Sequence, residues 1–350
     1  MAVSIKEVAE KAKVSQSTVS VVLNKRTREI GISEKTRKHV LAVAKEMDYI
    51  PSFYARHISR KSTFTIGMVV RDIMRPTTAM VVDGVKSEAT KDNYQVILGI
   101  SSFDPEQERG YIRNFLSRRV DGLVVIPVDS RETIQEIDNL YSRGFPIVAC
   151  KQAFMTQADS VIHDVEFGTY LAAKHLLELG HRRIACVYTD FPGPSAGDKY
   201  RGYCRAMSEY GLEAVSKELL VTIDKSNKEF GRTAGQAILA MDPLPDAVLF
   251  VNDEVASGAM NVLMDAGVRV PDDMSLIGFD GVIPEDTFRV PLTTVRPPHY
   301  EVGRQAVKIL MEKIESAKEN PDNNEKPAGP RKSIKLAPEL IIRKSTAPRK

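Results

Sequence analysis

Residues 4–24 read SIKEVAEKAKVSQSTVSVVLN, and this stretch decides how the first part of the chain folds. Ser4 stands three positions before Glu7, the spacing of a capping box, in which both side chains bind free N–H groups at a helix start. Apolar side chains recur at helical spacing over residues 5–12, and Ser15 is placed to cap a second helix. Two short helices joined by so tight a turn are typical of a helix-turn-helix.

The second helix, expected over residues 16–23, carries the surface that matters for function. Its valines at 19 and 22 can face the core, which leaves small polar side chains at its outer, N-terminal end, the part of a recognition helix that enters the major groove. The residues expected to contact bases are Gln16, Ser17, Ser20 and Val21. The residues expected to contact phosphates are Ser15, Thr18, Asn24, Lys25 and Arg26. Helical spacing alone also permits a small protein-binding module.

A third helix follows, and one turn residue should be strained. Ser33 is placed to cap this helix, whose apolar stripe completes a three-helix core. Lys13 occupies the turn between the first two helices, where glycine or asparagine adopts left-handed geometry at lower cost. We expect a small strain at Lys13 and no change in function.

The sequence motifs of these helices resemble the DNA-binding headpiece of the LacI family of bacterial repressors. The resemblance rests on residues 5–9, 14–20 and 22–24, and it continues through 33–37 and 49–52. It implies that residues 51–58 form a hinge helix that folds on the operator and enters the minor groove beside its dimer mate. The hinge residues implied are Ala55, Arg56 and Ile58. Family members usually insert a leucine where this chain has Ile58, whose branched side chain is stiffer but can still act as an apolar wedge.

Charge and composition agree with a DNA-binding end on a folded body. Residues 1–61 contain 13 Lys or Arg and 6 Asp or Glu, a net charge of +7, whereas the other residues contain 36 and 40, a net charge of −4. A basic end suggests a polyanionic partner. The three cysteines lack metal-ligand spacing and are expected to be reduced. With no signal peptide and no membrane-length apolar run, we expect a cytoplasmic protein.

From residue 64 onward, short apolar runs alternate with helical patterns. The runs expected as strands are 65–70, 95–99, 122–126, 146–150, 183–187, 247–251 and 275–279. This alternation predicts an α/β fold: a two-lobed core of parallel sheets flanked by helices, after a small all-α helix-turn-helix domain. The outline resembles a periplasmic binding protein and the regulatory core of the same family.

The chain is therefore divided into four parts, with three crossings between two lobes. The expected parts are a headpiece (1–48), a hinge helix and linker (49–63), an effector-binding and dimerisation core (64–344) and a basic tail (345–350). The expected lobes are an N-lobe of 64–165 plus 296–323 and a C-lobe of 166–295 plus 324–344.

Ligands in open α/β sheets bind beyond the carboxyl ends of the strands. Polar residues just after the apolar runs, together with the family resemblance, give the expected effector-binding residues: Arg71, Asp72, Lys151, His163, Lys199, Asn252 and Asp280. The resemblance implies that Asn252 and Asp280 line the cleft and that Asp280 accepts hydrogen bonds from ligand hydroxyls. The alternative for each of these residues is a polar strand-end group that caps a helix.

Departures from the family pattern suggest the kind of ligand. Sugar-binding members often have an acidic residue where this chain has Lys151, and arginine where it has Lys199. The loop after the first strand also lacks the usual aromatic pair. Cations that converge on one site favour a carboxylate or phosphate, so we expect an anionic effector, a sugar acid or a sugar phosphate. The alternatives are a neutral sugar held by Asp280 and Asn252, or cations paired within the protein, for instance Arg71 with Asp72.

No pattern for catalysis, metal or cofactor binding stands out. The chain has no phosphate loop of Walker type, no nucleophile elbow and no zinc-protease motif. We predict that it is not an enzyme and uses no cofactor or metal. The expected partners are palindromic double-stranded operator DNA, a small effector and a second copy of the chain, with dimer contacts near 80–88 and 302–313. The sequence does not choose between inducer and corepressor.

Overall fold

The computed structural model divides into two compact units, residues 1–63 and 64–350. It describes residues 3–23, 31–49, 62–128, 130–150, 156–189, 194–212, 217–224, 227–319 and 330–350. Each unit is described by itself.

The first unit is a bundle of three short helices. They are α1 (Ile5–Ala12), α2 (Gln16–Leu23) and α3 (Glu34–Glu46). The predicted capping box is present, because the Ser4 side chain accepts from the Glu7 N–H while the Glu7 carboxylate accepts from the Ser4 N–H. Ser33 caps α3 through the Thr36 N–H. Valines and alanines from all three helices form one buried cluster, and the predicted left-handed turn is confirmed at Lys13, with φ 52° and ψ 43°.

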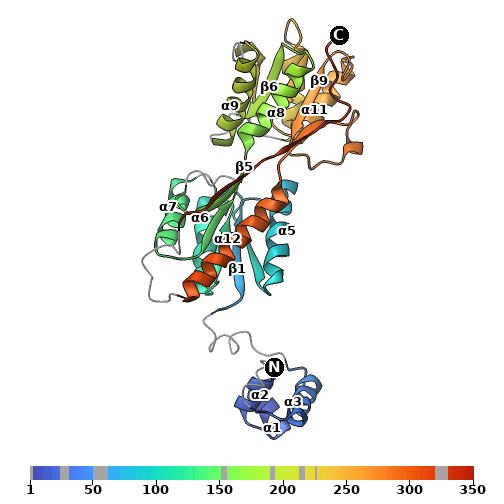
Figure 1. The fold of residues 1–350 in the computed structure, drawn as a ribbon. Coiled ribbons are helices and arrows are strands. Elements are labelled where there is room, and N and C mark those ends of the chain that lie inside the picture. The colour runs from blue at the N-terminus through green and yellow to red at the C-terminus, as the bar shows by residue number, and fades with distance from the viewer. Residues whose placement is uncertain are drawn as a thin grey trace. The chain divides into compact units, whose positions relative to one another are not determined.

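The second unit contains two six-stranded sheets (Figure 1). The first sheet, in spatial order, consists of β11 (Ser333–Leu336), β5 (Asp159–His163), β4 (Ile147–Cys150), β3 (Gly122–Val125), β1 (Thr65–Val70) and β2 (Gln95–Ile100). The second sheet consists of β12 (Glu339–Ile341), β10 (Thr293–Arg296), β9 (Ser275–Phe279), β8 (Ala247–Phe250), β6 (Ile184–Thr189) and β7 (Leu220–Ile223). All pairings are parallel except that of β12 with β10. The predicted fold class is confirmed.

Helices cover both faces of each sheet, which explains why the strands read as continuous apolar runs. The N-lobe helices are α5 (Pro76–Lys91), α6 (Pro105–Ser117), α7 (Arg131–Ser142) and α12 (His299–Glu319). Along β1, Ile66 and Met68 pack in a cluster with α5 and α12, whereas Val69 packs with α6 and α7. The helices of the C-lobe are α8 (Val165–Glu178), α9 (Pro194–Glu209), α10 (Lys228–Leu239) and α11 (Asp253–Asp265), with short 3-10 turns at Lys217–Leu219 and Glu285–Thr287.

The predicted boundary between the lobes needs one correction. The chain crosses at 164, at 297–298 and at 337–338, because β11 pairs with β5 in the first sheet while β12 pairs with β10 in the second. The segment up to Leu336 therefore belongs to the N-lobe, and the third crossing is not near 324. The strand β11 was missed because it has only four residues, in which exposed Ser333 and Lys335 alternate with Ile334 and Leu336.

The predicted basic tail, residues 345–350, is packed against the C-lobe. Ser345 is fully buried, where its hydroxyl donates to the Leu276 carbonyl and accepts the Thr293 N–H. Arg349 forms a 2.9 Å ion pair with Asp246, and Lys350 pairs with Asp272. The last six residues are thus part of the C-lobe.

Candidate functional site

The recognition helix α2 starts at a hydroxyl cluster. The Ser15 hydroxyl accepts the Thr18 N–H at 3.1 Å and lies 2.7 Å from the Ser17 hydroxyl and 2.8 Å from that of Thr18. Val19 and Val22 are buried in the three-helix core, as the sequence predicted. The cap fixes the first turn of α2, the part that reaches bases in a helix-turn-helix.

The outward side of α2 brings the predicted base-contacting residues together. Gln16 and Ser17 are exposed, while Ser20 and Val21 are half-buried beside them. This face presents one long amide, two hydroxyls and one small apolar group, which match the donors, acceptors and methyl groups of the major groove. Two other predicted groups lie outside the described residues: Asn24, Lys25 and Arg26, and the hinge residues Ala55, Arg56 and Ile58.

The C-lobe contributes two carboxylates and an amide at the ends of β8 and β9. Asn252 is the N-cap of α11, where its side-chain oxygen accepts the Val255 N–H at 2.9 Å. This is the helix-capping role that the sequence had left open. Asp280 follows β9 with φ 104°, a left-handed conformation that costs a non-glycine residue energy and often marks a functional site.

Asp253, the first residue of α11, anchors this corner. Its buried carboxylate accepts the Gly281 N–H at 2.8 Å and the Thr294 hydroxyl at 2.6 Å. It thereby links three elements: helix α11, the turn that follows β9, and strand β10. Burial, with the nearby charge of Asp280, raises the pKa of Asp253 to about 7 against these two hydrogen bonds. Asp253 thereby holds the Asp280–Gly281 turn in place.

Lys199, a predicted effector ligand, has partners inside the protein. Its ammonium donates to the Val251 carbonyl and lies 3.8 Å from the centroid of the Phe279 ring. Burial lowers its pKa, while Asp280 and Asp253 act in the opposite direction. This cation therefore faces the acidic corner of the C-lobe and is already engaged there.

Two histidines meet at the crossings between the lobes. His163, which ends β5, packs edge-on against His299 with ring centroids 5.2 Å apart. The Nε2 atom of His299 lies 3.9 Å from a carboxylate oxygen of Asp280. His299 was missed because it opens a helix far along the chain, and only the fold brings it beside Asp280.

The N-lobe contributes cations at the ends of β1 and β2. Arg75 lies 3.7 Å from Asp72, an ion pair within the N-lobe of the kind that the sequence allowed. The guanidinium carbons of Arg71 and Arg75 lie 5.7 and 5.9 Å from the ring centroid of Phe103, a second residue that sequence reasoning missed. Lys151 lies outside the described residues.

A buried carboxyl group supports this side of the cleft. Glu108 on α6 is fully buried and accepts the Val128 N–H, which fixes the backbone after β3. Burial raises its pKa to about 7, while the charge of Arg71 acts to lower it. Glu108 is thus a second acidic group near the strand ends whose ionisation falls close to neutral pH.

A small crevice of about 30 Å³ lies between Arg75 and the C-lobe residues Asn252, Asp253 and Asp280. It is lined by Arg75, Pro76, Thr77, Asn252, Asp253, Glu254, Asp280, Val282 and Ile283. The N-lobe wall carries the cation Arg75 and the first turn of α5, whereas the C-lobe wall carries three carboxyl groups. Such a crevice at the carboxyl ends of parallel strands is the expected ligand site of this architecture.

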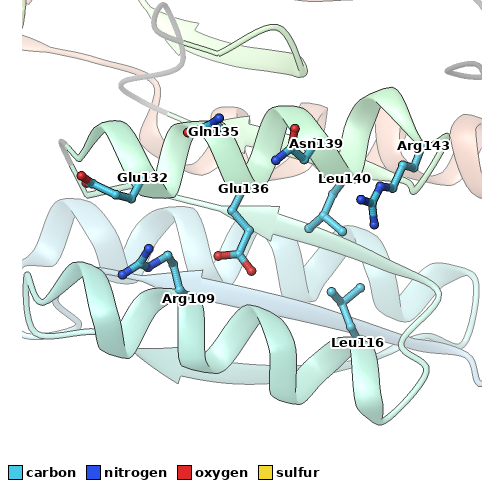
Figure 2. Close-up of a pocket in the computed structure, with 8 residues that line it drawn as sticks. All are labelled: Arg109, Leu116, Glu132, Gln135, Glu136, Asn139, Leu140 and Arg143. Atoms are coloured by element: carbon cyan, nitrogen blue, oxygen red, sulfur yellow. The ribbon is translucent and has the colours of Figure 1, made fainter.

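A larger hollow, of about 420 Å³, lies elsewhere, between α6 and α7 (Figure 2). In Figure 2 Arg109 and Leu116 of α6 face Glu136 and Leu140 of α7 across it. Its charges are matched nearby, since Arg109 pairs with Glu106 and Arg113 lies 3.5 Å from Glu136. No residue that the sequence singled out lines this hollow, so the crevice is the stronger candidate.

Two kinds of feature are absent from the described residues. Among them, no three His, Cys, Asp or Glu side chains are grouped to hold a metal ion. In the same part of the chain, no helix is long and apolar enough to cross a membrane.

Comparisons with known proteins agree with both units. Residues 4–52 match the model of bacterial regulatory proteins of the lacI family, and residues 173–346 match a periplasmic binding protein-like domain. An HTH-type transcriptional repressor PurR of Vibrio campbellii is 35% identical over 342 residues, 97% of each chain. A lac repressor dimer bound to operator and the anti-inducer ONPF has a TM-score of 0.86 at 25% identity, covering 99% of this chain and 100% of that one. A LacI family regulator from Enterococcus faecium with bound ribose has a TM-score of 0.66 at 28% identity, covering 82% and 100%.

Proposed function

The chain belongs to the LacI family of bacterial regulatory proteins, and from this premise we propose that it is a repressor whose effector is a hydroxylated anion. It is a ligand-controlled, DNA-binding transcriptional regulator, and its relatives are repressors rather than enzymes. The observation that supports the effector proposal is the grouping of two guanidinium groups, those of Arg71 and Arg75, over the Phe103 ring, with Arg75 also lining the crevice.

For DNA, we assign base contacts to Gln16, Ser17, Ser20 and Val21, and phosphate contacts to Ser15, Thr18, Asn24, Lys25 and Arg26. The exposed amide of Gln16 at the start of α2 supports this assignment. Ala55, Arg56 and Ile58 are assigned to the minor groove through the hinge. Two headpieces of a homodimer would then bind two half-sites of a palindrome, one helical turn or a multiple of it apart.

For the effector, the charges on the two walls suggest how a ligand is oriented. An ionised carboxylate accepts hydrogen bonds and donates none, so Asp280 suits the O–H donors of a sugar. Guanidinium groups suit a carboxylate or phosphate, so Arg71 and Arg75 suit the acidic end of the ligand. His299, at the start of α12, lies beside Asp280, and His163, at the end of β5, packs against His299, so both histidines belong to the N-lobe side. A sugar acid or sugar phosphate satisfies both ends.

A neutral sugar is the second candidate, and one observation favours it. Lys199 is engaged by the Val251 carbonyl and the Phe279 ring, so one predicted cation does not need an anionic ligand. The Enterococcus faecium relative was solved with ribose, which is uncharged. In this alternative Asp280 and Asn252 make the main hydrogen bonds to the sugar.

Thermal unfolding of the full chain with matched panels of neutral sugars, sugar acids and sugar phosphates separates the two candidates. A ligand at about a hundred times its Kd should stabilise the protein by roughly 2.7 kcal/mol. The proposal expects an acid or phosphate to stabilise, and expects Arg75→Ala or Lys151→Ala to abolish the effect. Arg232→Ala, which removes an exposed cation on α10, is the control and should leave the stabilisation by ligand unchanged. Stabilisation by neutral sugars alone would replace this proposal with the second.

Dimerisation and location complete the proposal. The relative bound to operator is a dimer, and we propose the same for this chain, in the cytoplasm where operator DNA is. The contacts predicted near 80–88 and 302–313 lie on α5 and α12, whose facing sides are already occupied: an added Cβ at Gly84 would lie 2.1 Å from the Tyr300 carbonyl oxygen. Only the outward sides of these helices are available to a partner. Effector binding would either release or organise the hinge.

A further inference from the structure

The loop from β2 to α6 holds a strained, exposed aromatic residue. Ser102 and Phe103 have φ values of 51° and 64°, so two successive non-glycine residues are left-handed. That conformation is a clear outlier for a bulky side chain. The loop is fixed on both sides, because the Ser101 N–H donates to the Val70 carbonyl and the Asp104 N–H donates to the Ser101 carbonyl.

Despite this cost, Phe103 does not enter the core. It is 42% exposed, which is unusual for a phenylalanine in a loop that is otherwise firmly held. Its ring lies at the carboxyl end of β2, next to the end of β1, where ligands bind in this architecture. Strain in an exposed aromatic residue at a ligand edge indicates a role in binding.

The charges around the ring fit a ligand with an acidic group. Arg71 and Arg75 both place their guanidinium carbons within 6 Å of the Phe103 centroid. Cations are attracted to an aromatic face, so the ring holds two like charges near each other. Asp72 offsets part of this charge through its contact with Arg75 at 3.7 Å, and it also accepts the Met74 N–H at 2.8 Å. The surface formed by Arg71, Arg75 and Phe103 therefore suits a ligand that has one acidic group next to one flat face.

We infer that Phe103 is a specificity residue that stacks on the ring of a cyclic anionic effector whose acidic group binds Arg71 and Arg75. The inference rests on the proposed anionic effector and narrows it from any sugar acid to one in ring form. A pyranose ring offers an apolar C–H face that can lie against an aromatic side chain, whereas an open-chain acid of the same charge offers no such flat face.

Binding of glucuronate, a cyclic acid, and gluconate, an open-chain acid, to the full chain tests this inference by calorimetry. Wild type should prefer the cyclic acid. Phe103→Leu keeps an apolar side chain but removes the aromatic face, and it should weaken glucuronate binding by roughly threefold to tenfold while changing gluconate binding less than twofold. Phe103→Tyr keeps the face and should restore the preference.

A variant of the neighbouring residue separates stacking from loop shape. Ser102→Gly relieves one left-handed residue without touching the ring, and it should leave the preference for the cyclic acid unchanged. Equal weakening of both acids by Phe103→Leu would overturn the inference, because Phe103 would then act only by placing the arginines. If gluconate binds wild type as well as glucuronate, the inference fails while the anionic effector survives. If neither these acids nor sugar phosphates bind but a neutral sugar does, both fail.

Discussion

Replacing Asp253 by asparagine should change how the stability of the core depends on pH. In wild type this buried carboxyl group has its pKa raised from 3.8 to about 7. Burial is the largest cause, because a charged carboxylate is poorly solvated there. Asparagine keeps the size and one acceptor for the Gly281 N–H, and it cannot ionise.

The sign follows from linkage. A group whose pKa is higher in the folded state favours folding fully only below its unfolded pKa, and that contribution is lost as pH rises toward the folded pKa. Each pH unit between the two pKa values costs about 1.36 kcal/mol. Between about pH 5 and about pH 8, wild type should therefore lose about 3 kcal/mol more stability than Asp253→Asn, almost all of it below about pH 7.

Differential scanning calorimetry of the full chain at these two pH values provides the comparison. The control is Glu254→Gln, because Glu254 is exposed on the same turn of α11 and lines the same crevice. The loss of stability of Glu254→Gln between the two pH values should equal that of wild type. Glu108, whose pKa is also raised by burial, remains in every variant and cancels from the difference. If wild type and Asp253→Asn lose equal stability as pH rises, burial does not control this carboxyl group and our account of the corner is wrong.

Three further predictions concern other parts of the chain. Gln16→Ala should relax base preference at one operator position by roughly 1–3 kcal/mol, whereas Arg26→Ala should weaken binding to all sites alike and lower the slope of log affinity against log salt concentration by about one. Titrations of operator variants at two salt concentrations check both effects. A uniform loss of affinity from Gln16→Ala would contradict its assignment to a base. Lys13→Gly should raise the stability of the headpiece by about 1 kcal/mol in calorimetry, because glycine adopts φ 52° without strain, and it should leave the core transition unchanged. Gly84→Ala should lower core stability by roughly 1–3 kcal/mol, because its Cβ would lie 2.1 Å from the Tyr300 carbonyl oxygen; the control is Gly110→Ala, where nothing lies within 4 Å, and equal effects of the two would refute the packing argument.

Local pattern predicted most of the fold. The capping box at Ser4 and Glu7 and the buried valines of α2 depend on residues a few positions apart, so the sequence contains them directly. The buried strands could be recognised for a similar reason, since helices on both faces require continuous apolar runs. Every residue of the edge strands β11 and β12 is exposed or partly exposed, and that weak pattern hid the third crossing.

The site could be predicted only as a set of strand ends. Arg71 and Asp280 were found because each follows an apolar run, and the architecture gathers such ends. Phe103 and His299 were not found, since one belongs to a loop whose backbone conformation is not visible in sequence and the other begins a helix at a crossing. The hydrogen bonds of Asp253 to Gly281 and Thr294 join three separate elements, and no local spacing encodes them.

The sign of the effector's charge bears directly on control of the lobes. Arg75 and the three carboxyl groups line opposite walls of one crevice, so the walls attract each other even when nothing lies between them. A neutral sugar would leave these charges as they are and would act only through its hydrogen bonds to Asp280. An acid would instead give Arg75 a new partner and leave the carboxyl groups of the C-lobe to its hydroxyls, so that the ligand joins the walls through two different kinds of contact. A ligand shifts an equilibrium only by its difference in affinity for the two states. A ligand with an acidic group at one end and hydroxyls at the other can bind both walls of this crevice at once, and it therefore binds one arrangement of the lobes better than another.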